Sequence, residues 1–286
     1  MARSAPLPYL LCAPAVVTTD AFSEEPLLER SDAGSGGAQT FTERPAPGAL
    51  GSLAAWLLIG LAVLLSFPLQ ALLFVACWPF DPLRRVSGLF FRRMSSLGAG
   101  LNPYWDFACA RAPAAPTRPT VVVANHASNV DPFLVCQVPF EMKWLGKASL
   151  FRVPLLGWSM ALAGDIPVRR GAHGAGHAAL AACARWVERG MPVIIFPEGT
   201  RSKDGALGPF KDGAFKLAVE TGADVLPLGL WGTHEALPKH SWRVGRSRGR
   251  LVAGAPIPSA GKTVAQLKAE VRAAVERLVR EASLAI

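Results

Sequence analysis

Cysteine is scarce in this sequence of 286 residues, and no two cysteines have the CxxC spacing of redox or zinc motifs. The five positions are Cys12, Cys77, Cys109, Cys136 and Cys183. An odd, scattered set predicts reduced thiols in a cytosolic domain rather than disulfides or a zinc site, and we interpret Cys136 as a small buried apolar residue. His173 and His177 lack the glutamate of a His-Glu-x-x-His motif, so we expect no metal site.

Charge is absent from one long segment, Ala49 to Trp78, which has no Asp, Glu, Lys or Arg in thirty positions. A straight helix of that length reaches about 45 Å, against a hydrocarbon core of about 30 Å. Because Pro68 lies inside it, the segment predicts either one kinked, tilted span or two shorter helices that enter one leaflet and return. We assign residues 48–82 to a membrane anchor.

Net negative charge is confined to the start of the chain. Residues 1–47 carry three Arg against six Asp and Glu and are rich in Ser, Gly and Pro, which predicts a disordered acidic tail. Because the whole chain has a net charge of +9, residues 48–286 carry +12. A basic body favours an anionic partner. Helix-turn-helix, zinc-finger and RNA-binding signatures are absent, so we expect an anionic membrane lipid and no nucleic acid.

Basic and apolar residues are interleaved directly after the anchor. Arg84, Arg85, Arg92 and Arg93 stand among Leu, Phe and Met residues. This pattern predicts an amphipathic helix lying on an anionic membrane face, with an ordinary solvated helix as the alternative. The arginine excess places residues 83–286 on the cytoplasmic side of an inner, or cytoplasmic, membrane.

Strand-like and helix-like stretches alternate through residues 83–286. We expect strands at 120–124, 142–145, 165–168, 193–196, 225–230 and 250–253, and helices at 131–138, 177–189, 212–221 and after the capping-box pair Thr263 and Gln266. This alternation predicts an α/β fold, a mostly parallel sheet flanked by helices, preceded by the N-terminal membrane-associated helical segment.

A histidine and an aspartate follow the β-branched run at residues 121–123. Four residues separate His126 from Asp131. A strand that ends near a histidine places the imidazole at the rim of a sheet, where α/β proteins bind ligands. The turn formers between the two residues can bring the carboxylate back to one imidazole nitrogen, which leaves the other free to accept a proton. A histidine that merely stabilises a turn is the alternative, and a second motif decides between them.

That second motif is Phe196-Pro-Glu-Gly-Thr-Arg-Ser202, which follows the apolar run at 193–195. Together, Asn125-His126-x4-Asp131 and this motif resemble the glycerolipid acyltransferase family, whose best-known members are the lysophosphatidic acid acyltransferases. Residues 147–154, Gly157 and residues 166–170 look like the second motif of that family, and 225–227 looks like its fourth. The resemblance covers residues 85–255.

The resemblance implies transfer of a fatty acyl group to the free hydroxyl of lysophosphatidic acid, which gives phosphatidic acid. The donor is expected to be acyl-CoA or acyl-carrier protein, with no other cofactor. His126 is expected to act as general base and Asp131 to orient it. The expected substrate-binding residues are Glu198, Gly199, Thr200, Arg201, Arg169 and Lys147. Members of the family also include two-helix anchors, so the resemblance supports that alternative for residues 48–82.

Other functions remain open at this stage, because fold and motif do not fix the acceptor. The same chemistry could act on lyso-ornithine lipid, glycerol 3-phosphate or another lysophospholipid. With water in place of the alcohol, the protein would be a thioesterase or lipid hydrolase. The intact motif residues argue against an inactive lipid-binding module. Ser128 is an alternative nucleophile, but a thioester is already activated, and we favour a turn role for this serine.

Overall fold

The computed structural model describes residues 45–169, 174–202, 204–238 and 241–285. The expected acidic tail lies outside these ranges except for residues 45–47. His173 also lies outside them.

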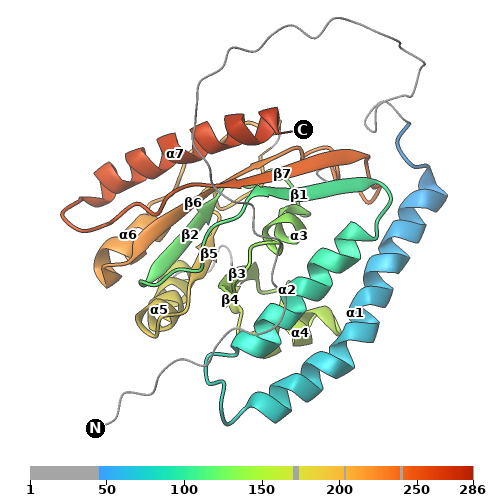
Figure 1. The fold of residues 1–286 in the computed structure, drawn as a ribbon, viewed down its shortest axis with the longest axis horizontal. Coiled ribbons are helices and arrows are strands. Elements are labelled where there is room, and N and C mark those ends of the chain that lie inside the picture. Colours follow the sequence, from blue (N-terminus) through green and yellow to red (C-terminus); the bar gives the residue numbers. More distant parts are fainter. Residues whose placement is uncertain (1–44, 170–173, 203, 239–240, 286) are drawn as a thin grey trace, which may run out of the picture. The chain divides into compact units, whose positions relative to one another are not determined.

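The described residues form a seven-stranded sheet with the order β1-β7-β6-β2-β5-β3-β4 (Figure 1). The strands are β1 (Trp105–Arg111), β2 (Thr120–Ala124), β3 (Lys143–Lys147), β4 (Ile166–Val168), β5 (Val193–Ile195), β6 (Asp224–Trp231) and β7 (Ser247–Ala253). Neighbouring strands are parallel except β6 and β7, which are antiparallel. The predicted mostly parallel sheet is confirmed, although β1 was not among the expected strands.

Helices cover both faces of this sheet (Figure 1). They are α1 (Ala49–Cys77), α2 (Arg85–Gly100), α3 (Asp131–Val135), α4 (Leu156–Ala163), α5 (Ala175–Glu188), α6 (Gly213–Thr221) and α7 (Val264–Leu284), with a short 3₁₀ helix η1 (Leu150–Arg152). In β2, Val121 and Val123 pack in one core with α5, α6 and α7, whereas Val122 and Ala124 pack in another with α3. A strand buried on both faces reads as a continuous apolar run, which explains why β2 was visible in the sequence.

Two expected helix starts have different outcomes. At α7, the N–H of Gln266 donates to the Thr263 hydroxyl (3.3 Å) and the N–H of Thr263 donates to Gln266 Oε1 (2.9 Å), so the capping box is confirmed. At α6, Asp212 occupies the N-cap position without capping the helix. Its carboxylate instead accepts a 2.7 Å bond from Lys268 of α7, which ties the two helices together.

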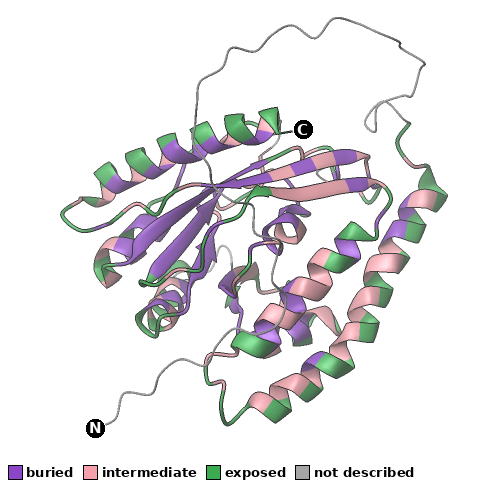
Figure 2. Ribbon diagram, viewed as in Figure 1, coloured by how far each residue is buried: buried purple, intermediate pink, exposed green. Residues whose placement is uncertain are grey.

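Helix α1 is continuous from Ala49 to Cys77 and contains Pro68. An 18-residue stretch of the helix has a mean hydropathy of 2.4, and 6% of that stretch is buried. By length and composition the helix could therefore cross a membrane. Figure 2 shows the helix as mostly exposed or half-buried, in contrast to the buried central strands. One side nevertheless contacts the rest of the protein, because Gln70 donates to the carbonyl of Ser159 in α4 (3.0 Å).

Helix α2 lies beside α1 (Figure 1) and is only partly the exposed basic helix that the sequence predicts. Arg92 is 5% exposed, pairs with Asp165 and lies 3.7 Å from Glu141. Lys143, also buried, lies 3.2 Å from the same glutamate. The expectation that Arg92 faces a membrane is wrong, because α2 packs against the sheet domain and the carboxylates replace water around this guanidinium.

Candidate active site

His126 lies two residues beyond the carboxyl end of β2, at the edge of the sheet. Its Nδ1 is 2.7 Å from Oδ2 of Asp131, the first residue of α3. In a neutral imidazole held this way, Nδ1 carries the proton and donates to the carboxylate, so Nε2 presents a lone pair. The chain therefore curls after β2 as the spacing predicts. The catalytic role of the pair stays a prediction.

Asp131 is fully buried and is held from several sides. Besides the imidazole, its Oδ2 accepts the N–H groups of Ala127 and Ser128, each at 2.8 Å. Its Oδ1 accepts a short hydrogen bond from the hydroxyl of Thr233, just beyond β6. These donors fix the carboxylate in one orientation, and the carboxylate fixes the imidazole.

The polar neighbours of the pair serve the loop itself. The Asn125 amide donates to the carbonyl of Leu230 (2.9 Å) and accepts its N–H (2.8 Å), which braces the loop against β6. Ser128 is fully buried and donates to the carbonyl of Leu237 (3.2 Å), which supports the turn role over the nucleophile role. Cys136 is buried, and burial raises the pKa of its thiol to about 12, so it is not poised as a thiolate.

The second motif is joined directly to the histidine. The N–H of His126 donates to Oε1 of Glu198 (2.8 Å), and the N–H of Ser202 donates to the carbonyl of His126 (2.9 Å). The imidazole also stacks on Phe196, with ring centroids 4.3 Å apart. Burial raises the pKa of Glu198, while hydrogen bonds from the N–H groups of His126 and Gly208 act in the opposite direction.

Between these bonds the motif makes a tight turn. Gly199 has a φ of 69°, a conformation that favours glycine. A Cβ there would lie 2.8 Å from Nζ of Lys211, so the lysine side chain lies against the turn. Thr200 is exposed and Arg201 is half-buried. Neither side chain pairs with another residue in the part of the chain that the structure describes. The turn is thus fixed, and its hydroxyl and guanidinium remain available for a ligand.

The remaining expected residues come from the neighbouring strands. Lys147 ends β3 and is exposed, and Arg169 follows β4. Because β2, β5, β3 and β4 are adjacent and parallel, their carboxyl ends share one edge of the sheet. Lys147 therefore lies on the edge that carries His126 and Arg201. Arg169 follows β4 on the same edge, where it lines a hollow together with Arg152.

Thr233 and Arg152 were not among the site residues predicted from the sequence. The signal for Thr233 was a hydroxyl residue just after a strand, but its relevance depends on β6 lying next to β2, which the sequence does not state. Among the described residues, no group of three His, Cys, Asp or Glu side chains could hold a metal ion.

Comparison with known proteins finds similarity to acyltransferases. The family model described as Acyltransferase matches residues 109–231. A chloroplast 1-acyl-sn-glycerol-3-phosphate acyltransferase from Brassica napus is 41% identical over 123 residues, which are 43% of this chain and 36% of that protein. The corresponding Arabidopsis thaliana protein is 34% identical over 165 residues, 57% of this chain and 46% of its own length. The chain thus spans less than half the length of these plant relatives.

A solved structure resembles more of the chain. The crystal structure of the 1-acyl-sn-glycerophosphate acyltransferase from Thermotoga maritima matches with a TM-score of 0.60 and 25% identity, over 81% of this chain and 97% of the other. The match supports the mostly parallel α/β fold. Residues 109–231 therefore form an acyltransferase-family domain, which confirms the resemblance that the sequence motifs predict.

Proposed function

We propose that this protein transfers a fatty acyl group from a thioester to the free hydroxyl of lysophosphatidic acid and so produces phosphatidic acid. The observation that carries the proposal is the 2.7 Å contact between His126 Nδ1 and the Asp131 carboxylate. The backbone of His126 is in turn hydrogen-bonded to the Glu198 carboxylate and to the N–H of Ser202. The activity for which the relatives are named supports the acceptor. The acyltransferase-family domain supports the reaction class.

The pair performs one proton transfer in each direction. Nε2 of His126 accepts the proton of the acceptor hydroxyl while that oxygen attacks the thioester carbonyl. The new C–O bond forms, the C–S bond breaks, and the imidazolium returns the proton to the departing thiolate. Asp131 stabilises the imidazolium between these steps. General-base assistance of this kind is worth roughly 10²–10⁴-fold.

The phosphate of the acceptor is held at the same edge of the sheet. Arg201 follows the turn bonded to His126, and Lys147 lies at the end of β3 on that edge. A guanidinium can grip a phosphate with two parallel hydrogen bonds, and an ammonium adds a point charge. The exposed hydroxyl of Thr200 is available to the same ligand, and Gly199 lets the backbone approach it.

Glu198 positions the histidine rather than contacting the glycerol. Its Oε1 accepts the N–H of His126 and its Oε2 accepts the N–H of Gly208 (3.1 Å). Both oxygens of this buried carboxylate are therefore already used by the backbone.

Helix α1 anchors the protein to one leaflet of a membrane, with the sheet domain on the cytoplasmic side. The helix contacts the body near both ends: Ser52 accepts the N–H of Val244 (3.1 Å), and Gln70 donates to Ser159 (3.0 Å). A helix held along its length cannot cross the bilayer without drawing polar surface into the hydrocarbon. Its exposed side, which includes Leu57, Leu61, Leu64, Leu65, Leu72 and Val75, instead enters the lipid.

An acceptor panel tests the proposal. The purified chain in detergent is given labelled acyl-CoA or acyl-carrier protein with lysophosphatidic acid, lyso-ornithine lipid, glycerol 3-phosphate and other lysophospholipids. The proposal predicts label in phosphatidic acid, fastest with lysophosphatidic acid. A faster reaction with another acceptor would reassign the substrate. Release of free fatty acid at a rate independent of any acceptor would assign a thioesterase instead.

A further inference from the structure

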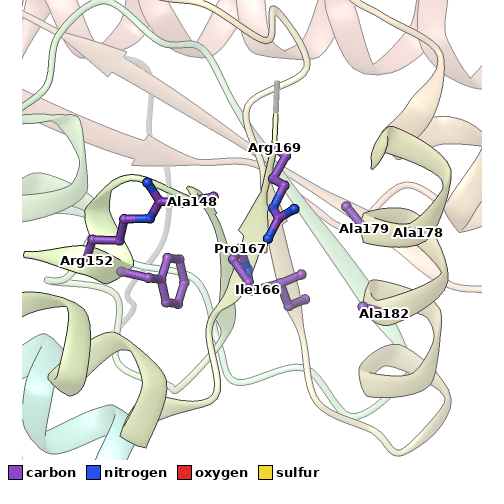
Figure 3. Close-up of a pocket in the computed structure, with 9 residues that line it drawn as sticks. Ala148, Arg152, Ile166, Pro167, Arg169, Ala178, Ala179 and Ala182 are labelled. Atoms are coloured by element: carbon purple, nitrogen blue, oxygen red, sulfur yellow. The ribbon is translucent and has the colours of Figure 1, made fainter. Parts of the chain in front are cut away.

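A hollow of about 550 Å³ lies beside β4, the edge strand of the sheet (Figure 3). Ile166 and Pro167 of β4 form part of its wall, and alanines of α5 face them from one side. Phe151 of η1 lines it as well. A volume of this size suits a small organic group, since ligand pockets commonly measure roughly 300–1,000 Å³.

Two arginines give the hollow its charge. Arg152 follows Phe151 in η1 and Arg169 follows β4. Figure 3 shows both side chains among the residues that line the hollow. Neither guanidinium has a hydrogen bond or ion pair with another residue in the described ranges. No acidic side chain is among the described residues that line the hollow. Two guanidinium groups without a partner in the part of the chain that the structure describes, next to apolar lining residues, fit a ligand in which a phosphate is attached to an apolar or aromatic group.

The hollow lies on the same edge of the sheet as the candidate base. From β2 to β4 the order is β2-β5-β3-β4, so three strand intervals separate the end of β2 from the end of β4. At about 4.8 Å per interval this separation is roughly 14 Å. Lys147 and Arg201, assigned above to the acceptor phosphate, are not among the residues that line the hollow. The hollow is therefore a second cationic site, distinct from the residues assigned to the acceptor phosphate.

We propose that this hollow binds the phosphate end of the acyl donor, the phosphopantetheine group that acyl-CoA and acyl-carrier protein share. The pantetheine arm then runs along the carboxyl ends of β3 and β5 and presents its thioester at His126. An arm equivalent to four or five residues of extended chain spans roughly 15 Å, which matches the separation of the two sites. This inference rests on the proposed transferase function, and it reassigns Arg169 from the acceptor to the donor.

Donors with and without the phosphate provide the test. Steady-state kinetics are measured with acyl-CoA, acyl-carrier protein and S-acyl-pantetheine, for the wild type, Arg152→Gln, Arg169→Gln and the double variant. Arg185→Gln, an exposed arginine of α5 outside the hollow, is the matched control. The double variant is expected to raise the KM for phosphate-bearing donors about tenfold or more. Its kcat, its KM for lysophosphatidic acid and its turnover of S-acyl-pantetheine should stay within twofold of wild type.

The pattern across donors identifies the source of the phosphate. A raised KM for both phosphate-bearing donors assigns the hollow to phosphopantetheine itself. A raised KM for only one of them assigns the hollow to that donor. The inference would be overturned by an unchanged KM for both donors, by an equal rise in the KM for S-acyl-pantetheine, or by a raised KM for lysophosphatidic acid.

Direct binding separates this inference from the proposed function. Titration of CoA into the full-length protein without acceptor should give an affinity that falls about tenfold or more in the double variant and not in Arg185→Gln. A wild-type protein that binds CoA in this way but transfers no acyl group to any acceptor would contradict the proposed function alone. A wild-type protein that transfers acyl groups while the variant binds CoA equally well would contradict the inference alone.

Discussion

The backbone N–H of His126 donates a 2.8 Å hydrogen bond to the carboxylate of Glu198, a residue 72 positions later in the chain. The other oxygen of that carboxylate accepts the N–H of Gly208 at 3.1 Å. One buried side chain therefore holds the backbone of His126 in place and also fixes the end of the loop that carries Arg201. The two sequence motifs form one structural unit through this contact.

Substitution of Glu198 should lower kcat rather than raise the KM for the acceptor. Glu198→Gln keeps one acceptor oxygen, and its kcat should fall about tenfold. Glu198→Ala loses both hydrogen bonds, and its kcat should fall about a hundredfold. Steady-state kinetics with varied lysophosphatidic acid check this split. If the KM rises while kcat stays constant, Glu198 contacts the substrate and the positioning role is wrong.

The hydroxyl of Thr233 should matter through Asp131, to which it donates. Thr233→Val keeps the shape but removes the donor, and we expect kcat to fall by about two- to tenfold because the carboxylate is held less firmly. Thr233→Ser keeps the hydroxyl and should restore most of the rate. Equal rates for the valine variant and the wild type, at equal thermal stability, would show that this bond has no part in the reaction.

The sequence predicted the centre of the fold because local pattern and chemistry agree there. β2 and β5 are short apolar runs buried on both faces, and each is followed by a motif whose residues recur in a known family. The contact between His126 and Asp131 followed from spacing and turn residues alone. The capping box at Thr263 was visible because both partners lie within one helical turn.

The rest depended on contacts between distant segments. β1 was missed because its sequence, from Trp105 to Arg111, mixes charged and small residues, and its pairing with β7 supplies what the local pattern lacks. The burial of Arg92 could not be expected from its basic neighbours, since its partners Asp165 and Glu141 lie far along the chain. The hollow beside β4 exists only once η1 and α5 lie next to that strand.

The buried charges around Arg92 predict a pH dependence of stability. Burial raises the pKa of Glu141 to about 7 from an ordinary value of 4.5. Between these values the folded protein holds a proton that the unfolded chain has released, so the free energy of unfolding should fall as the pH rises from about 5 to 8. Glu141→Gln cannot titrate and should show a shallower fall.

Thermal unfolding of the wild type and of Glu141→Gln at a series of pH values measures this difference. Asp212→Asn, which changes an exposed carboxylate at the N-cap of α6, serves as the control and should keep the wild-type slope over this range. Parallel slopes for wild type and Glu141→Gln would show that Glu141 titrates normally in the folded protein.

The exposed side of α1 should govern binding to vesicles. In Leu61→Glu/Leu65→Glu two carboxylates would have to enter the lipid, and we expect at least a tenfold weaker partition to anionic vesicles in a flotation assay. Leu284→Glu, at a more exposed leucine at the end of α7, should bind as the wild type does. Unchanged flotation of the double variant would contradict insertion through this side of the helix.

The most direct test of the proposed reaction is the rate at which label moves from acyl-CoA to lysophosphatidic acid in His126→Ala. The proposed role of the imidazole predicts a loss of roughly 10²–10⁴-fold with unchanged thermal stability. His177→Ala, an exposed histidine of α5, should keep the wild-type rate. A His126→Ala protein that transfers the label within a few-fold of the wild-type rate would contradict the proposed mechanism.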